Sequence, residues 1–214
     1  MSSHARAERA RLAELLSAAG PEAPTLCAGW TTRDLAAHLV VREARPDAAA
    51  GIRLRALAGH TEKVQNRYAA RPFEELVRVF RSGPPTLSPF RLPGADAAAN
   101  LVEYFVHAED VRRAVPFEPE PVDPALAEAL WKRVPVVARF SDARSPVTLQ
   151  LRHPDGRMVT FRQGAGEGPA VTVTGEPGEL VLFLSGRGAK AAVEASGDPE
   201  AVARVAAALP LPGN

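Results

Sequence analysis

The most distinctive pattern of polar and apolar positions lies near the middle of the chain, where a predicted helix is apolar on almost all sides. From 97 to 108 its strongly polar side chains are Asn100, Glu103 and His107. At 100° per residue, these three and Asp110 fall within an arc of roughly 80°. A helix that is apolar on nearly all sides is typical of a buried position, where a carboxylate and an imidazole are costly unless something neutralises them. The pattern predicts a buried helix with one polar stripe; the alternative is a solvated Glu–His pair on a surface helix.

The rest of the first half predicts further helices joined by mostly short loops. One helix is expected over about 3–19, ended by Gly20-Pro21, and a second begins at the capping-box-like Thr31-Thr-Arg-Asp34 and runs toward Arg45. A third helical region covers about 59–81 with a break near 71–72, and the striped helix covers about 95–114. The proline-containing stretch 82–89 is expected to be a loop. Four such helices predict a four-helix bundle over residues 1–116, and bundles place metal sites between inward side chains.

A proline-punctuated connector, 115–124, separates this bundle from a region of different composition. Residues 122–214 predict a small α+β domain, so that the whole chain is of the α+β class. Its helices are expected over about 124–140, 177–184 and 199–209, the last capped by Asp198. Strands are expected over 147–152, 158–162, 170–174 and 190–196. The turn Pro154-Asp-Gly156 predicts a hairpin between the first two strands, in a mostly antiparallel sheet.

Composition excludes several functional classes. The chain has 214 residues and a net charge of +1, which argues against a nucleic-acid binder that neutralises phosphates. No apolar run approaches the ~20 residues that span a bilayer, so no membrane partner is expected. Cys27 is the single cysteine, which excludes an intrachain disulfide and is consistent with a reducing compartment. We therefore expect a cytoplasmic protein.

Glu103 and His107 are spaced i, i+4 and offer a metal ion two ligands about one turn apart. A third protein ligand must come from elsewhere, and His38 is the best candidate because it shares a helix face with core leucines. The alternative for His38 is a hydrogen-bonded core histidine. His60, near the start of the third helical region, is the reserve candidate, and its alternative is a surface position.

Three further residues are candidates for supporting chemistry. Asp110, one turn beyond His107, is expected to accept a hydrogen bond from a ligand imidazole; the alternative is an exposed pair with Arg113. Arg187 is a candidate for carboxylate recognition, with an exposed arginine in a helix-terminal turn as its alternative. Cys27 is expected to be a small buried thiol in a tight loop beneath the second helix, although a nucleophilic role is also conceivable.

Two segments resemble signatures of a known family. The run from Cys27 through Trp30 and Asp34 to His38-Leu39 resembles the N-terminal signature of the mycothiol-dependent maleylpyruvate isomerase-like proteins, part of the DinB-like group of metal-binding four-helix bundles. The run from 100 to 113 resembles the second signature of that group. Residues 170–198 resemble the attached C-terminal domain, which is related to sterol-carrier-like folds. Within the group, the chain is most similar to an actinobacterial branch of metal-binding proteins of unassigned reaction.

The resemblance implies a divalent metal, usually zinc, held by His38, Glu103 and His107. Two nitrogens and one oxygen leave a coordination position open, the pattern of a catalytic zinc site. In the characterised isomerases this position serves a low-molecular-weight thiol, mycothiol, which becomes a nucleophilic thiolate on the metal. The expected function is therefore a thiol-dependent, mycothiol-type transferase or isomerase that acts on a small electrophilic substrate. The alternative is a non-catalytic metal-binding protein in which the ion is structural.

Overall fold

The computed structural model describes residues 3–49, 51, 54–85, 95–117, 120–141, 147–161 and 169–212. The chain divides into two compact units, Met1–Glu118 and Pro119–Asn214. The division falls in the proline-punctuated connector that separates the two predicted domains. Residues 86–89, half of the expected loop 82–89, lie outside the described residues.

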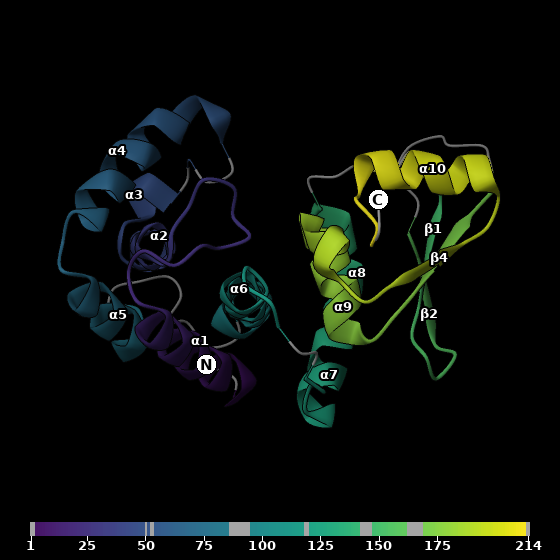
Figure 1. Ribbon diagram of the computed structural model, residues 1–214, viewed down its shortest axis with the longest axis horizontal. Coiled ribbons are helices and arrows are strands. Elements are labelled where there is room, and N and C mark those ends of the chain that lie inside the picture. Colours follow the sequence, from purple (N-terminus) through teal and green to yellow (C-terminus); the bar gives the residue numbers. More distant parts are fainter. Residues whose placement is uncertain are drawn as a thin grey trace. The chain divides into compact units, whose positions relative to one another are not determined.

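The first unit is helical (Figure 1). Its elements are α1 (Ser3–Ala19), α2 (Thr32–Ala44), α3 (Pro46–Ala49), the 3-10 turn η2 (Arg55–Leu57), α4 (Ala58–Ala69), α5 (Phe73–Ser82) and α6 (Ala95–Arg112). The expected third helix is divided into α4 and α5, with Pro72 as the N-cap of α5. The short α3 and η2 were not predicted: Pro46 cannot continue α2, but its fixed φ suits the first turn of a new helix.

The core of this unit is built mainly by α1, α2, α5 and α6. Fully buried side chains from these four helices form one apolar cluster, which includes Leu12, Leu16, Leu35, Leu39, Leu76, Phe80 and Tyr104. Burial of a leucine or phenylalanine side chain contributes roughly 1.5–3 kcal/mol to folding. The cluster therefore packs α2, which carries His38, and α6, which carries the polar stripe, into one core.

A buried ionic group crosses this apolar core. Arg9 of α1 binds the Glu43 carboxylate of α2 with both terminal nitrogens, each at 2.8 Å, and all but 3% of either side chain is buried. The Tyr104 hydroxyl of α6 donates to Glu43 Oε1 at 2.6 Å and also contacts Arg9. The group therefore ties α1, α2 and α6 together through one carboxylate.

A second carboxylate, Glu109 of α6, is surrounded by arginines. It accepts hydrogen bonds from Arg11 at 2.7 Å, from Arg112 at 2.7 Å and from Arg113 at 2.6 Å, and its side chain is 2% exposed. Burial by itself would raise its pKa, but hydrogen bonds from Arg112, Arg11 and Arg113 lower the pKa of Glu109 to about 2. The carboxylate is therefore charged in the folded protein at every ordinary pH.

We expect Glu109→Gln to lower the free energy of unfolding by about 2–3 kcal/mol at pH 7, because the arginines lose the charge that they neutralise. The folded-state pKa of about 2 lies below the ordinary value of 4.5. The carboxylate's contribution is therefore complete well above pH 4.5 and declines as the pH falls toward 2. Urea unfolding at pH 7 and pH 3 should show the difference between wild type and variant shrink by about half. The exposed Glu14→Gln on α1 is the matched control, and a difference that stays constant with pH would contradict the prediction.

The second unit is α+β. Its helices are α7 (Pro124–Trp131), α8 (Val134–Phe140), α9 (Pro177–Leu182) and α10 (Pro199–Ala208), with the turns η4 (Phe183–Arg187) and η5 (Gly188–Lys190) after α9. Its strands are β1 (Leu149–Arg152), β2 (Met158–Phe161), β3 (Val171–Thr174) and β4 (Glu194–Ser196). The sheet order is β2-β1-β3-β4; β1 is parallel to β3, and the other two pairs are antiparallel.

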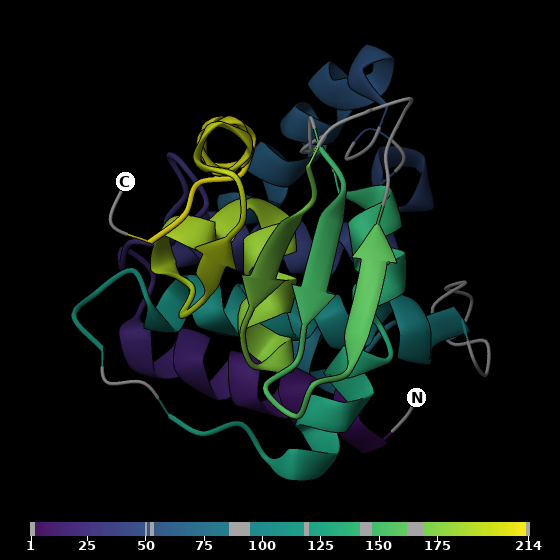
Figure 2. The same cartoon turned by 90° about the vertical axis from the view of Figure 1, so that its right-hand side faces the viewer.

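One face of this sheet is covered by α8 and α9, which lie behind the strands in Figure 2. The side chains that strands β1 and β3 turn inward are buried, namely Leu149, Leu151, Val171 and Val173. The alternation of these residues with polar ones matches the period-2 pattern from which the strands were predicted. The mixed α and β composition expected for the chain is confirmed.

Two details of the second unit differ from the sequence prediction. The expected helix 124–140 is interrupted between Trp131 and Val134, where Pro135 enters the first turn of α8 and cannot donate to the preceding turn. The expected strand 190–196 pairs only over 194–196, and Lys190 ends the turn η5. Two of the three strand pairs are antiparallel, which agrees with the expected mostly antiparallel sheet, and the pair of β1 with β3 is parallel. None of the described helices is long and apolar enough to cross a membrane.

Candidate metal centre

The polar stripe of α6 lies inside the helical unit. Asn100 and Asp110 are completely buried, and His107 is 8% exposed. The Glu103 side chain is 25% exposed and is the most accessible of the four. The stripe is flanked by buried apolar side chains of the same helix, namely Leu101, Phe105, Val106, Ala108 and Val111. The expectation of a polar stripe on an interior helix therefore agrees with the observed burial.

His38 reaches the stripe from α2. A capping box fixes the start of that helix, since the Thr31 backbone N–H donates to Asp34 Oδ2 at 2.9 Å. His38 is 6% exposed, and its ring centroid lies 5.5 Å from that of His107 in an edge-on arrangement. The indole of Trp30, just before the cap, lies 5.0 Å from the His38 ring and packs against the core. The capping box, the apolar core and the Trp30 indole together orient the His38 imidazole toward α6.

Three nitrogens converge on one oxygen of Glu103. His107 Nε2 lies 3.3 Å from Glu103 Oε1, His38 Nε2 lies 3.5 Å from it, and Arg42 Nε lies 3.2 Å from it. The candidate ligand atoms of His38, Glu103 and His107 all lie within 4.8 Å of one another. Tetrahedral zinc with bonds of about 2.0–2.1 Å spaces its nitrogen and oxygen ligands roughly 3.3 Å apart. The measured nitrogen–oxygen separations match this spacing, so the donor set suits a divalent cation.

Arg42 is a member of the site for which the sequence indicated no role. It lies one turn after His38, and its Nη1 donates to Asn100 Oδ1 at 2.5 Å. The guanidinium therefore joins the Glu103 carboxylate to the buried Asn100 amide. Its neighbour Glu43 faces the buried ionic group instead, and Tyr104, next to Glu103, does the same. On both helices, consecutive residues thus serve the site and the ionic group.

The charges of the site support one another. Burial would raise the pKa of Glu103, but hydrogen bonds from His107 and His38 and the charge of Arg42 hold that pKa well below its ordinary value. Burial would lower the pKa of His107, but hydrogen bonds with Asp110, Cys27 and Glu103 raise that pKa well above its ordinary value. The carboxylate is therefore ionised and ready to bind a cation, whereas binding would require His107 to release a proton.

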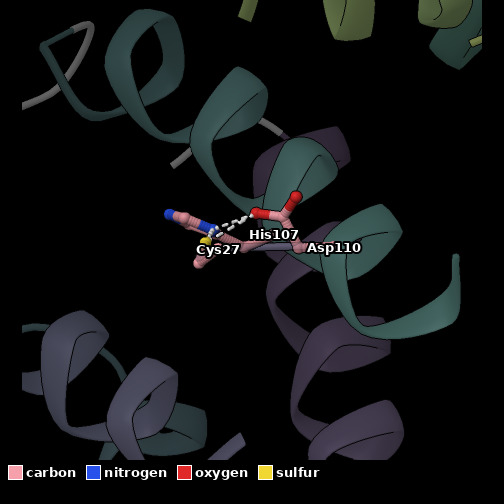
Figure 3. A group of neighbouring side chains, drawn as sticks. All are labelled: Cys27, His107 and Asp110. Atoms are coloured by element: carbon pink, nitrogen blue, oxygen red, sulfur yellow. Dashed lines mark hydrogen bonds and ion pairs between the residues drawn. The ribbon is translucent and has the colours of Figure 1, made fainter. Parts of the chain in front are cut away.

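Behind His107 lies a second polar group, which Figure 3 shows. His107 Nδ1 is 2.9 Å from Asp110 Oδ2, and the Cys27 thiol donates to the same oxygen at 3.2 Å. Asp110 thus lies where a carboxylate orients an imidazole so that Nε2 faces a metal. Arg113, its alternative partner, donates from Nε to Glu109 at 2.6 Å. Cys27 was expected to be buried, but the residue is partly exposed, and its thiol contacts α6.

His60 is not part of either of these groups, and Arg187 belongs to the other unit of the chain. His60 is exposed and pairs with Asp47, with Nε2 3.2 Å from Oδ2, so its surface alternative agrees with the structure. Arg187 belongs to the second unit, in the turn η4, where its Nη1 donates to the Ser185 carbonyl at 2.5 Å. A role for Arg187 in carboxylate recognition stays a prediction.

Comparison with known proteins supports the resemblance found in the motifs. Residues 2–49 match the model of the mycothiol maleylpyruvate isomerase N-terminal domain, a segment that contains both Cys27 and His38. Among solved structures, the mycothiol-dependent maleylpyruvate isomerase is 16% identical over 91% of this chain and 90% of that chain, with a TM-score of 0.50. A histidine-to-alanine mutant of that isomerase has the same identity and coverage and a TM-score of 0.56. No curated protein matches the chain. The predicted resemblance to this family is confirmed, and the structural likeness shows a shared fold.

Proposed function

We propose that this protein binds a divalent cation through His38, Glu103 and His107 and catalyses a thiol-dependent transfer or isomerisation on a small electrophile. The single observation that carries the proposal is the convergence of both imidazole Nε2 atoms on Glu103 Oε1, at 3.5 Å and 3.3 Å. The similarity to a mycothiol-dependent isomerase adds the choice of a small thiol, such as mycothiol, as the co-reactant.

The residues present fit such a cation, with zinc as the first candidate. Two neutral imidazoles and one carboxylate leave a coordination position for a further ligand. A bound divalent cation lowers the pKa of a coordinated thiol and thereby supplies a nucleophile near neutral pH. The partial exposure of Glu103 places it where a small molecule can reach the group, whereas His38 and His107 are almost fully buried.

The protein's own side chains set the geometry for this chemistry. Asp110 accepts from His107 Nδ1 and so leaves Nε2 directed at the cation. Arg42, joined to Asn100, contacts the same Glu103 oxygen as the two imidazoles and adds a positive charge beside the site. This charge favours an electrophile that carries a carboxylate. Arg187 of the second unit stays a separate candidate for carboxylate recognition, on the grounds of its sequence context alone.

The experiment is an assay of thiol consumption and of cis–trans isomerisation. Metal-loaded protein is mixed with mycothiol or another small thiol and a panel of electrophilic unsaturated acids. We expect thiol-dependent turnover, and we expect His38→Ala to lower kcat/KM at least about 100-fold, because the cation loses one of three ligands. His60→Ala, an exposed histidine in the same unit, should leave kcat/KM unchanged.

A tightly bound cation without any thiol-dependent turnover would contradict the proposal. In that case the ion has a structural role, the alternative that the sequence also allows. Removal of the ion by a chelator would then lower the melting temperature without affecting any reaction.

A further inference from the structure

The imidazole of His107 has polar groups on both of its nitrogens. Nε2 faces Glu103, whereas Nδ1 faces Asp110 and, at 4.0 Å, the sulfur of Cys27. We propose that Cys27, Asp110 and His107 Nδ1 form a second cation site, selective for thiophilic divalent cations such as Cd²⁺. This second site does not depend on the proposed function. Only its competition with the first site, formed by His38, Glu103 and His107, involves that function.

The spacing of the three donor atoms suits a tetrahedral ion. Cys27 Sγ lies 3.2 Å from Asp110 Oδ2, His107 Nδ1 lies 2.9 Å from that oxygen, and sulfur and nitrogen are 4.0 Å apart. For zinc, bonds of about 2.3 Å to sulfur and about 2.0 Å to nitrogen and oxygen give ligand separations of roughly 3.3–3.6 Å. Each observed separation is within about half an ångström of that range. Small side-chain shifts therefore suffice to admit an ion.

The loop that carries the thiol is held in place. The Leu26 N–H donates to the Asp110 carbonyl at 3.0 Å, and the Trp30 N–H donates to the Cys27 carbonyl at 3.0 Å. The Thr25 hydroxyl accepts from the Cys27 N–H at 3.2 Å. Because the loop is tied to α6 at the position of Asp110, sulfur and carboxylate are kept adjacent before any ion arrives. The partial exposure of Cys27 gives an ion access to a group that is otherwise buried.

Charge and ligand type distinguish the two sites. The charges of a thiolate and a carboxylate together neutralise a divalent ion, and a neutral imidazole adds none. One carboxylate and two neutral imidazoles leave a net charge of +1. An uncompensated charge is costly in a buried position, so the balanced site favours burial of the ion. Thiolate is a soft ligand and prefers soft ions, whereas a site of nitrogen and oxygen ligands suits harder ones. We therefore expect Cd²⁺ to prefer the Cys27 site over the Glu103 site.

The two sites share the imidazole of His107. A neutral imidazole has one unprotonated nitrogen, so it can bind an ion in only one of the two sites at a time. An ion on Nε2 leaves the proton on Nδ1, where it is donated to Asp110. An ion on Nδ1 instead takes the lone pair that this proton occupies, and the proton moves to Nε2, where it would point at Glu103 Oε1. Each ion therefore excludes the other, so that a thiophilic cation removes one ligand from the first site.

Because Cys27 is the only cysteine in the chain, a thiolate-to-metal charge-transfer band reports on this site alone. Metal-free protein is titrated with Cd²⁺ while the ultraviolet band is recorded. We expect a band that saturates at one ion per chain, and that is absent from Cys27→Ala. In Asp110→Asn we expect at least about a tenfold weaker Cd²⁺ affinity, because a charged ligand is lost. In His38→Ala, which dismantles only the first site, we expect the band to saturate with a midpoint within about threefold of wild type.

Three results would overturn the proposal. These are a wild-type protein without a saturable band, a band with unchanged affinity in Asp110→Asn, or a band that disappears in His38→Ala. Displacement tests the exclusion: Cd²⁺ added to zinc-loaded protein should release one zinc per cadmium bound, and retention of both ions would contradict it. An absence of thiol-dependent turnover would leave all of these results unchanged, so the two proposals fail separately.

Discussion

Replacing His107 with alanine is expected to abolish stoichiometric binding of a divalent cation. His107 belongs to both groups of candidate ligands among the described residues, so no intact group of three remains. We expect the dissociation constant for Zn²⁺ to rise at least about 100-fold, since two protein ligands seldom hold zinc. Calorimetric titration of chelator-treated protein and elemental analysis of the protein as purified both measure the effect.

The control for this prediction is His60→Ala, which removes an exposed imidazole from the same unit and should leave zinc affinity unchanged. Since His107 is buried, circular dichroism must show that the variant is folded. His107→Gln, which keeps a polar side chain in the same space, serves as the second variant. Unchanged zinc content in both folded variants would remove the basis of the proposed metal centre.

Arg9→Met is expected to lower the free energy of unfolding by about 3–5 kcal/mol. The substitution leaves the Glu43 carboxylate buried without the guanidinium that binds it through two hydrogen bonds, and an uncompensated buried charge costs several kcal/mol. Methionine has nearly the length of arginine, so the loss of packing is small. The measurement is urea unfolding at pH 7 with zinc absent, so that ion binding does not contribute.

Arg6→Met, an exposed position on the same helix, is the matched control and should change stability by less than about 0.5 kcal/mol. The double variant Arg9→Met/Glu43→Leu is expected to recover most of the loss, because it removes both buried charges. A double variant as unstable as Arg9→Met alone would show that packing, and not charge, causes the effect.

The parts of the structure that sequence predicted are those determined by local patterns. The capping box of α2 and the break at Pro72 each depend on neighbouring residues, and the structure has both. The burial of the polar stripe follows from the apolar side chains that surround it on α6. The contact between α2 and α6 that brings His38 to Glu103 is not local, and the sequence suggested it only through the need for a third ligand and the family resemblance.

Other features depend on long-range contacts that no periodicity reveals. Arg9 and Glu43 are 34 residues apart, and on the pattern of α1 an arginine is simply a solvated side chain. The Cys27 thiol reaches Asp110, 83 residues later, and the loop is tied to α6 there by the backbone hydrogen bond from Leu26 to Asp110. The parallel pairing of β1 with β3 likewise depends on the whole sheet.

In α2, Arg42 belongs to the candidate metal centre and the next residue, Glu43, belongs to the buried ionic group. In α6, Glu103 and Tyr104 are divided in the same way. Both groups therefore depend on the same rotational position of each helix about its axis. Deleting one residue of the helix ahead of either pair would rotate both members by about 100° about the helix axis. The deletion would therefore disrupt the candidate metal centre and the buried ionic group at the same time. A point substitution can alter either group alone, but a one-residue deletion within the helix alters both. Length variation among related chains should therefore be confined to the loops, with the interval from His38 to Glu43 and from Glu103 to Asp110 kept constant.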